Sequence, residues 1–353
     1  MASSHLANKF DGNKVDKQFR NLNNLLREPS NGPVPIDIVI EEINKLKTFV
    51  EQVSVSPDPS KRAFEIVRAR YQNGSDNPIT SLRAFAKNSP EPVQRWLMSL
   101  ADETWNQMLM SAHTHINSEW ISQVYQPYHR GLAGRYPLNR SAKQELELFD
   151  FSEFFKPQGT MDKFYLEYIK PFVKSRQRWS NREVDGNTLG ISNDALNQLR
   201  KAYKIKNLFF RNNSNMPSLE FQMRPFAMSK NDARFTLEIG DKQLNYSHGP
   251  KFWKTFDWSS ADEDKRVRIV FEDLNDEIHS HTYTGPWAWF RLQDNFKLKK
   301  MGLSNIYRVT YVVNQLYGED IISHKIEYEI KAQSVSNSFG DNSLTTFRCP
   351  KNI

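Results

Sequence analysis

The sequence predicts an α+β protein, with a helical domain over residues 1–212 and an antiparallel β-sandwich domain over residues 213–353. Upstream of residue 212, apolar residues recur every three or four positions, which is the spacing of one helix face. Downstream, apolar and polar residues alternate over short runs, which is typical of half-buried strands. The polar run 212–215 separates the two patterns, and we expect the domain boundary there.

Amphipathic segments predict helices at residues 15–27, 36–53, 61–71, 79–86, 90–128 and 193–210. The segment 90–128 is the longest, and Ser89 with Pro90 is a suitable start for it. The weak helix formers at 113–118 favour a kink or a break inside it. The helical domain therefore divides into one or two sub-bundles, and we expect 180–192 to be a loop.

An aromatic junction occupies residues 134–173. Its aromatic residues are Phe149, Phe151, Phe154, Phe155, Phe164, Tyr165, Tyr168 and Phe172. We expect a first short helix capped by Asp150 or Ser152, and a second capped by Thr160. We also expect Phe151, Phe154, Phe155 and Phe164 to be buried and to join the long helix to the last helices before the sandwich.

Strands are predicted at 219–223, 235–239, 267–271, 307–313 and 326–330, within a set of about eight that is typical of a sandwich. Residues 285–292 predict a short helix capped by Thr284, lying across one end of the sandwich. The basic run 297–300 is interpreted as a solvated helix end. Four tryptophans are interpreted as core residues at the end of the sandwich, or alternatively as an aromatic patch for a partner. They are Trp253, Trp258, Trp287 and Trp289.

The charge distribution argues against nucleic-acid binding. The chain of 353 residues has a net charge of +7, from 48 Lys and Arg against 41 Asp and Glu. Because the two signs are interspersed, a solvated surface is favoured over a nucleic-acid groove. No apolar run reaches the ~20 residues of a membrane helix, and no signal peptide is apparent.

The sequence contains no pattern for catalysis or for cofactor binding. Phosphate-binding Gly-rich loops and Gly-x-Ser-x-Gly elbows are both absent. With Cys349 as the only cysteine, neither a disulfide within the chain nor a Cys-based metal site can form. His113 and His115, with His129 nearby, are interpreted as solvated or capping residues. We therefore expect no catalytic residue, no cofactor and no metal.

Two further polar groups receive the same interpretation. His279 and His281 share a strand face, yet no third His or Cys is close in sequence, so a surface pair is expected. The acidic run 262–264 is interpreted as an exposed loop, because a catalytic carboxylate pair needs burial to shift its pKa.

Several motifs, in chain order, resemble the TssM/IcmF family. The signature residues are Gly134, Arg135, Tyr136, Pro137, Asp150, Phe151, Phe154, Phe155, Gly159, Asp162 and Phe164, then His248, Gly249 and Pro250, then Gly285, Pro286, Trp287, Phe290 and Arg291, and finally Cys349 and Pro350. The chain departs from the pattern at Leu138, where the family usually has Phe. Lys156 and Gln158 stand where one version of the motif has Gly. We interpret the signature residues as structural.

The resemblance implies the C-terminal, periplasmic portion of an inner-membrane component of type VI secretion. In that family the β-domain binds the outer-membrane lipoprotein TssJ, copies assemble together, and a TssL/DotU-like protein is bound through parts outside this chain. The implied role is a non-enzymatic scaffold. The partner contact is expected on the loops and edge strands of the sandwich.

Alternatives remain open. Within the family, the alternative is the IcmF relative of the Dot/Icm type IVB system. Outside it, the tryptophans of the sandwich raise the hypothesis of a carbohydrate- or peptidoglycan-binding module, which requires exposed, coplanar Trp rings. A hydrolase requires convergent carboxylates or a Ser/His pair in a pocket.

Overall fold

The computed structural model describes residue 26 and residues 34–74, 76–176, 178–259, 266–302, 305–317, 320–332 and 342–353. These residues divide into two compact units. Unit 1 contains residues up to Glu119 together with Ile169–Ile191, and unit 2 contains Trp120–Tyr168 and Ser192–Ile353. Each unit is therefore made of two separate stretches of the chain. The boundary at residue 212 was predicted from the change of secondary structure alone, and it stays a prediction.

Unit 1 is built on helices that begin near prolines. They are α3 (Pro35–Ser54), α4 (Pro59–Asn73), α5 (Pro78–Lys87) and α6 (Val93–Trp120), whose last residue belongs to unit 2. Pro is favoured in a first helical turn because its missing N–H has no helical partner there. Asp58 and Asn77 cap α4 and α5 by accepting hydrogen bonds from the backbone N–H of Lys61 and Thr80. Three of these helices confirm the predictions closely.

The longest helix differs from its prediction in where it begins and where it becomes irregular. It begins at Val93 rather than Pro90, and it continues unbroken through residues 113–118, where a kink or a break was expected. The irregularity comes later, as a π-helical turn at Ile121–Tyr125 before α7 (Gln126–Gly131). The predicted helix 15–27, apart from residue 26, and the acidic loop 262–264 lie outside the described residues.

The stretch 180–192, predicted as a loop, contains one small hairpin, and a second hairpin leads into it. A 3₁₀ turn (Lys170–Phe172) leads into β1 (Val173–Ser175), which pairs with β2 (Trp179–Asn181). β3 (Glu183–Val184) then pairs with β4 (Asn187–Thr188). No local pattern indicated these strands, because runs of two or three residues are too short to show alternation.

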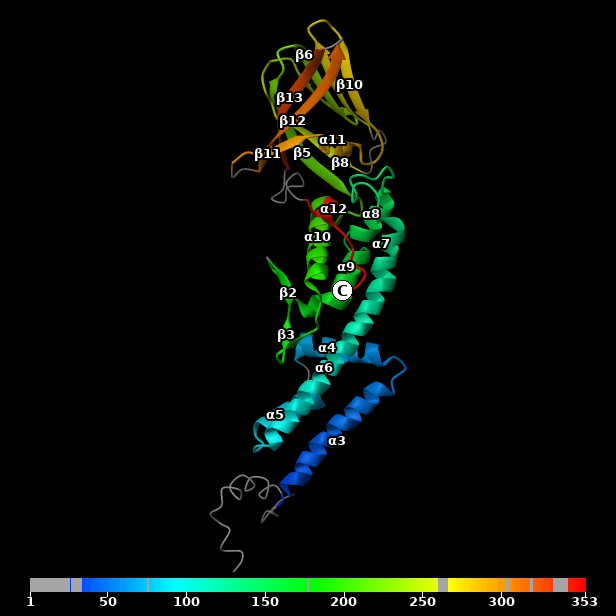
Figure 1. Cartoon of the computed structure of the whole chain (residues 1–353), viewed down its shortest axis with the longest axis vertical. Helices are drawn as coiled ribbons and strands as arrows, with labels where there is room; N and C mark the ends of the chain where they lie inside the picture. Colours follow the sequence, from blue (N-terminus) through cyan, green and yellow to red (C-terminus); the bar gives the residue numbers. More distant parts are fainter. Residues whose placement is uncertain are drawn as a thin grey trace, which may run out of the picture. The chain divides into compact units, whose positions relative to one another are not determined.

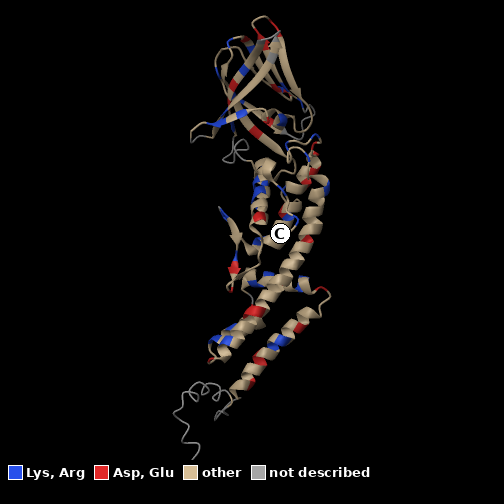
Figure 2. Ribbon diagram, viewed as in Figure 1, with Lys and Arg blue, Asp and Glu red and all other residues tan. Residues whose placement is uncertain are grey.

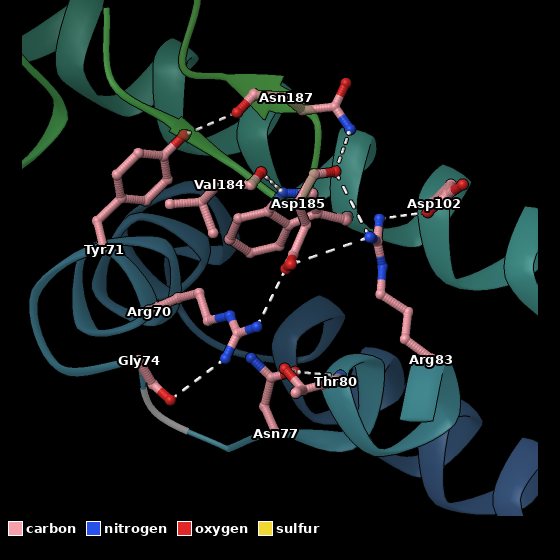
Figure 3. A network of polar contacts seen from close by, with 11 residues as sticks. Arg70, Tyr71, Gly74, Asn77, Thr80, Arg83, Asp102, Val184, Asp185 and Asn187 are labelled. Atoms are coloured by element: carbon pink, nitrogen blue, oxygen red, sulfur yellow. Dashed lines mark hydrogen bonds and ion pairs between the residues drawn. The ribbon is translucent and has the colours of Figure 1, made fainter. Parts of the chain in front are cut away.

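The β3–β4 hairpin is attached to the helices of unit 1 mainly through hydrogen bonds to its main-chain carbonyls (Figure 3). Tyr71 donates a hydrogen bond to the carbonyl of Asn187 at 3.2 Å, and the indole of Trp105 donates to that of Val184 at 3.4 Å. Burial raises the pKa of Tyr71 to about 12, so its hydroxyl stays a donor. The hairpin therefore depends on two buried rings from α4 and α6.

Asp185 is the charged centre of this contact (Figure 3). Its carboxylate accepts a hydrogen bond from Arg70 at 3.1 Å and lies 4.0 Å from an Arg83 guanidinium nitrogen. Arg83 also pairs with Asp102 of α6. The side chains of Arg70 and Arg83 are 15% and 14% exposed, so the guanidinium groups depend on these acids for neutralisation.

Unit 2 carries short helices and the sandwich (Figure 1). After α7 come α8 (Leu148–Phe155), α9 (Thr160–Phe164), a π-helical turn (Tyr165–Ile169), α10 (Asn193–Phe209) and a 3₁₀ turn (Arg211–Asn213). Ser192 caps α10 by accepting from the N–H of Ala195. The expected caps of α8 and α9 are wrong, because Glu147 and Gly159 occupy those positions without side-chain capping bonds.

The strands form two antiparallel sheets, which confirms the α+β fold class with a C-terminal sandwich. One sheet has the order β11-β12-β13-β5-β8 and the other β10-β9-β6-β7. The strands are β5 (Ser218–Met228), β6 (Asp232–Ile239), β7 (Lys242–Tyr246), β8 (Lys254–Ser259), β9 (Val267–Asp273), β10 (Ile278–Tyr283), β11 (Lys297–Lys300), β12 (Ile306–Tyr317) and β13 (Asp320–Ala332). A final short helix, α12 (Ser343–Thr346), precedes the C-terminal residues.

Alternation along these strands puts one face of each sheet into the core. Leu237 and Ile269 face each other across β6 and β9 and are both fully buried, as are Val309 and Tyr328 across β12 and β13. The basic run 297–300 is the edge strand β11, not a helix end, and all its residues are exposed. Lysines on an edge strand discourage pairing with another chain.

A charged triad spans the outer face of the larger sheet. Glu329 accepts hydrogen bonds from Arg224 at 2.7 Å and from Arg308 at 3.1 Å. Burial by itself raises the pKa of Glu329, but the two arginines outweigh burial and hold that pKa below its usual value. Figure 2 shows acidic and basic residues interspersed over the helices and strands in this way.

We predict that Asp185→Ala lowers the free energy of unfolding by about 1–3 kcal/mol, because it leaves two largely buried guanidinium groups short of an acceptor. Urea unfolding followed by circular dichroism measures the effect. Glu183→Ala, an exposed acid on the same hairpin, is the matched control and should change the midpoint little. Equal midpoints for the two variants would contradict the role given to Asp185.

Candidate functional site: the signature core and the free end of the sandwich

The family-signature segments converge on one aromatic core in unit 2. Phe151, Phe154, Phe155 and Phe164 are between 0% and 2% exposed, as the sequence predicted. Phe151 of α8 packs against Phe209 of α10 at 5.2 Å between ring centroids, and against Trp287 at 5.2 Å. The junction is therefore packed against both a helix and the segment that precedes α11 (Ala288–Gln293) of the sandwich.

The C-terminal residues complete this core. Phe347, which is fully buried, packs on Phe155 at 5.2 Å and on Tyr128 of α7 at 5.6 Å. The carbonyl of Pro350 accepts a hydrogen bond from the indole of Trp120 at 2.8 Å. Trp120 also packs on Phe164 at 5.2 Å. Burial raises the pKa of the Cys349 thiol, which marks it as an unreactive core residue.

Polar signature residues fix the backbone around the rings. Trp287 donates its indole hydrogen to the carbonyl of Leu146 at 2.6 Å. Arg291 bonds the carboxylate of Glu145 at 2.6 Å and stacks over Tyr136 at 4.0 Å. These contacts join residues more than 140 positions apart in the sequence, so no local pattern could have revealed Glu145 or Leu146 as their partners.

Two other signature acids fix the helices of the junction. Asp150 lies 3.7 Å from Arg135. Asp162 accepts from the backbone N–H of Gln158 at 2.9 Å and pairs with Lys206 of α10. Both acids therefore hold neighbouring segments in place, which is a structural role.

Glycine is required at two signature positions for different reasons. At Gly285, φ is +96° and an added Cβ would lie 2.7 Å from a carboxylate oxygen of Glu145. At Gly159, an added Cβ would lie 2.7 Å and 2.9 Å from the carbonyl oxygens of Glu153 and Lys156. Gln158, which departs from the family pattern, adopts φ +59°, the conformation that a glycine accommodates without strain.

The remaining signature residues lie around the sandwich. His248 has φ +57° and its Nε2 lies 2.8 Å from the carbonyl of Asp232, while Gly249 and Pro250 follow in an exposed turn. Pro286 accepts from the indole of Trp258 at 3.0 Å. Phe290 packs against Phe209 and Trp258. α11 contacts β9 and β10, and Trp287, not Thr284, occupies its N-cap position without a side-chain bond.

The tryptophans do not form a sugar-binding platform. Trp287 and Trp289 are fully buried and Trp258 is 6% exposed, while Trp253 is half-buried beneath Arg224 and Lys331. A carbohydrate module requires the first two rings to be exposed. The hypothesis of a carbohydrate-binding module, which was motivated by these tryptophans, is therefore not supported by the structure.

One cavity of about 320 Å³ adjoins the signature core. It is lined by Tyr136, Asp294, Gln293 and apolar residues of α10, β12 and β13. Burial, followed by the nearby charge of Asp294, raises the pKa of Tyr136 far above its usual value. The phenol therefore stays protonated and donates to Asp294 at 2.9 Å. This pair is a structural hydrogen bond and is not poised for proton transfer at neutral pH.

Two histidine interpretations are wrong in part. His115 is buried at 8% exposure, packs on Phe64 at 5.4 Å, and is therefore not solvated. His279 points inward with 11% of its side chain exposed, whereas His281 is exposed. A third histidine, His324 of β13, stacks on His279 at 4.2 Å, a neighbour that proximity in sequence could not reveal.

Exposed apolar side chains occur on the β9–β10 and β12–β13 hairpins of the sandwich. Leu316 and Ile321 are paired across the β12–β13 hairpin and are 74% and 66% exposed. Leu274 and Ile278, beside the β9–β10 turn, are 68% and 64% exposed. The contact of His279 with His324 brings the two hairpins together. We call these four residues the apolar end. The alternation in the sequence places Val313 inward. Because side chains alternate along a strand, the same pattern places Leu316, three residues later, outward.

Comparison with known proteins agrees with these features. A family model described as the type VI secretion protein IcmF helical domain matches residues 111–215, and another described as the IcmF C2-like domain matches residues 221–323. The chain belongs to the TssM/IcmF family. It is 27% identical over 349 residues to the type VI secretion system component TssM1 of Pseudomonas aeruginosa, covering 98% of this chain and 30% of that protein.

Solved structures share the fold. A chain of a type VI secretion system membrane core complex superimposes with a TM-score of 0.74 at 15% identity, covering 96% of this chain and 70% of that one. The TssM C-terminal domain from EAEC superimposes with a TM-score of 0.58 at 17% identity, over 69% of this chain and 98% of that domain. None of the helices in the described ranges combines the length and apolarity needed to cross a bilayer.

We predict that Gly159→Ala destabilises the protein by about 1–3 kcal/mol, because the methyl group meets two backbone carbonyls that cannot move without disturbing α8. Gly131→Ala is the control, since its Cβ would meet no atom closer than 3.8 Å. Thermal unfolding of the two variants measures the difference. A melting temperature for Gly159→Ala that equals the wild-type value would refute the close packing inferred here.

Proposed function

We propose that this chain is a structural, non-enzymatic component of a type VI secretion membrane complex. The observation that carries the proposal is the match of both IcmF domain types, in order, over the helical and the sandwich parts of the chain. The type VI names of the similar proteins favour this system over the type IVB alternative. The chain spans about 30% of the curated relative's length, and its role is proposed for this portion.

The sandwich is the proposed binding part, and its partner is an outer-membrane lipoprotein of the TssJ type. Its function is then to connect a periplasmic scaffold to the outer membrane. The buried tryptophans and the hydrogen-bonded signature core support a rigid domain, and rigidity lowers the entropic cost of binding. The apolar end supplies exposed side chains of the kind that interfaces bury.

The edge strand β11 is a weaker candidate for the contact. β11 carries lysines along its length, and charged edges resist strand addition. Between β11 and the apolar end, the apolar end is therefore the surface favoured for the lipoprotein.

Self-assembly is proposed for the helical surface of unit 1. A groove of about 350 Å³ between α3 and α6 is lined by Val50, Leu100 and Met108, among others. Exposed apolar side chains continue along α6 at Trp96 and Met110, which are 58% and 63% exposed. A second copy of this chain is the proposed occupant. Light scattering over a range of concentrations tests it, and a constant monomer mass up to millimolar concentration would exclude it.

We predict that the purified chain retains the TssJ-type lipoprotein of the same secretion cluster in a pull-down. Ile321→Asp should weaken this binding at least about tenfold, since a charge in a buried apolar contact is left unpaired. Lys325→Asp is the control, because Lys325 is exposed on the same strand and lies outside the apolar end. The whole chain is used because the sandwich shares its core with residues of the junction.

Two outcomes would contradict this proposal in different ways. Absence of lipoprotein binding at micromolar concentration by the folded wild-type chain would refute the partner. Equal binding by Ile321→Asp and the wild type would refute the apolar end as the contact surface, while leaving the partner in place.

A further inference from the structure

Three potential metal ligands meet at the β9–β10 hairpin. One ligand atom each from Asp273, Glu277 and His279 lies within 4.8 Å of the other two. We propose that this hairpin binds a divalent first-row transition metal ion, of which Zn²⁺ is the representative. Imidazole nitrogen combined with carboxylate oxygen is a donor set that suits such ions. The sequence-based expectation of no metal is replaced by this proposal.

The turn itself orients the first ligand. One carboxylate oxygen of Asp273, Oδ1, accepts hydrogen bonds from the backbone N–H groups of Asn275 and Glu277 at 2.7 Å and 3.0 Å. Both bonds use the same oxygen, so Oδ2 is left to face His279, whose Nε2 lies 3.7 Å away. The carboxylate is therefore fixed by the backbone with one oxygen free.

The second ligand is fixed by packing. The ring of His279 stacks on His324 with a centroid distance of 4.2 Å and an interplanar angle of 26°. His324 is held in turn by Asp232, whose Oδ1 lies 2.5 Å from its Nδ1. Such partners, which orient a ligand without touching the metal, are a regular feature of metal sites. The imidazole of His279 is thus preorganised.

Buried polar atoms without hydrogen-bond partners lie on His279 and on the two residues that support it. Nε2 of His279 is buried, and the group that it faces, Oδ2 of Asp273, lies 3.7 Å away, beyond the length of a normal hydrogen bond. Nε2 of His324 and Oδ2 of Asp232 are buried without a hydrogen-bond partner, in side chains that are only 2% and 0% exposed. Buried polar atoms without partners are uncommon in native proteins and call for an unseen water or ion. The three atoms belong to side chains joined by the contacts His279–His324 and His324–Asp232, and a bound ion would give Nε2 of His279 a partner.

The spacing of the ligand atoms fits a small ion. A tetrahedral ion with bonds of about 2.1 Å separates its ligand atoms by roughly 3.4 Å. The 3.7 Å between Asp273 Oδ2 and His279 Nε2 is close to this value. Glu277 is exposed, so its carboxylate is free to close the third side. Three protein ligands leave a further coordination position, which water occupies or which a group from a partner can fill.

The test is titration of the metal-depleted whole chain with zinc chloride, followed by calorimetry. We expect one Zn²⁺ per chain, and an affinity reduced at least about tenfold in both His279→Ala and Glu277→Gln. Glu277→Gln alters only an exposed side chain and so keeps the fold intact if His279→Ala does not. His281→Ala is the matched control, because this exposed histidine is on the same strand, and it should bind as the wild type does.

Either of two results would overturn the proposal. The first is the absence of zinc binding by the wild-type chain up to millimolar metal. The second is binding that Glu277→Gln leaves unchanged, which would assign the ion to other histidines. The proposal does not rest on the lipoprotein contact, so failure of one experiment does not decide the other.

Discussion

The buried contact between Phe151 and Trp287 is the interaction on which unit 2 depends. Phe151 comes from the first short helix of the junction, and Trp287 comes from the segment that starts α11 between two sandwich strands. Their rings meet at 5.2 Å, and the Trp287 indole is anchored to Leu146 of the junction. Aromatic rings bury a large area each, and edge-to-face pairs add to this stabilisation. The sandwich and the helices of unit 2 therefore share one core.

This shared core explains why the signature residues are not a chemical site. The polar members donate their hydrogen bonds to neighbouring segments: Tyr136 to Asp294, Arg291 to Glu145, and Trp287 to the carbonyl of Leu146. Groups that are fully used in holding backbone segments together are poorly suited to bind or transform a ligand. Exposed apolar side chains and buried polar atoms without a hydrogen-bond partner also occur at the β9–β10 and β12–β13 hairpins and on the strands beside them. Binding functions are therefore expected at those hairpins.

Periodic patterns predicted most of the architecture because they reflect burial directly. The helices α3, α4, α5 and α10 and the long strands β5, β6, β9, β12 and β13 follow such patterns. Failures occurred where the pattern was too short or the deciding contact was distant. Lys297–Lys300 forms a strand only because β12 provides its partner, and nothing local indicates this. The cluster around His279 depends on His324 and Asp232, which come from other strands, so only the fold could bring it together.

The central claim is that the junction and the sandwich of unit 2 form one cooperative structure around Phe151 and Trp287. Native-state hydrogen exchange tests it most directly, because it measures the free energy of opening for each segment separately. We predict that amides of α8 and α11 exchange with the same opening free energy as those of β5 and β13. Exchange of α8 through a local opening of much lower free energy, with the strands still protected, would contradict the claim.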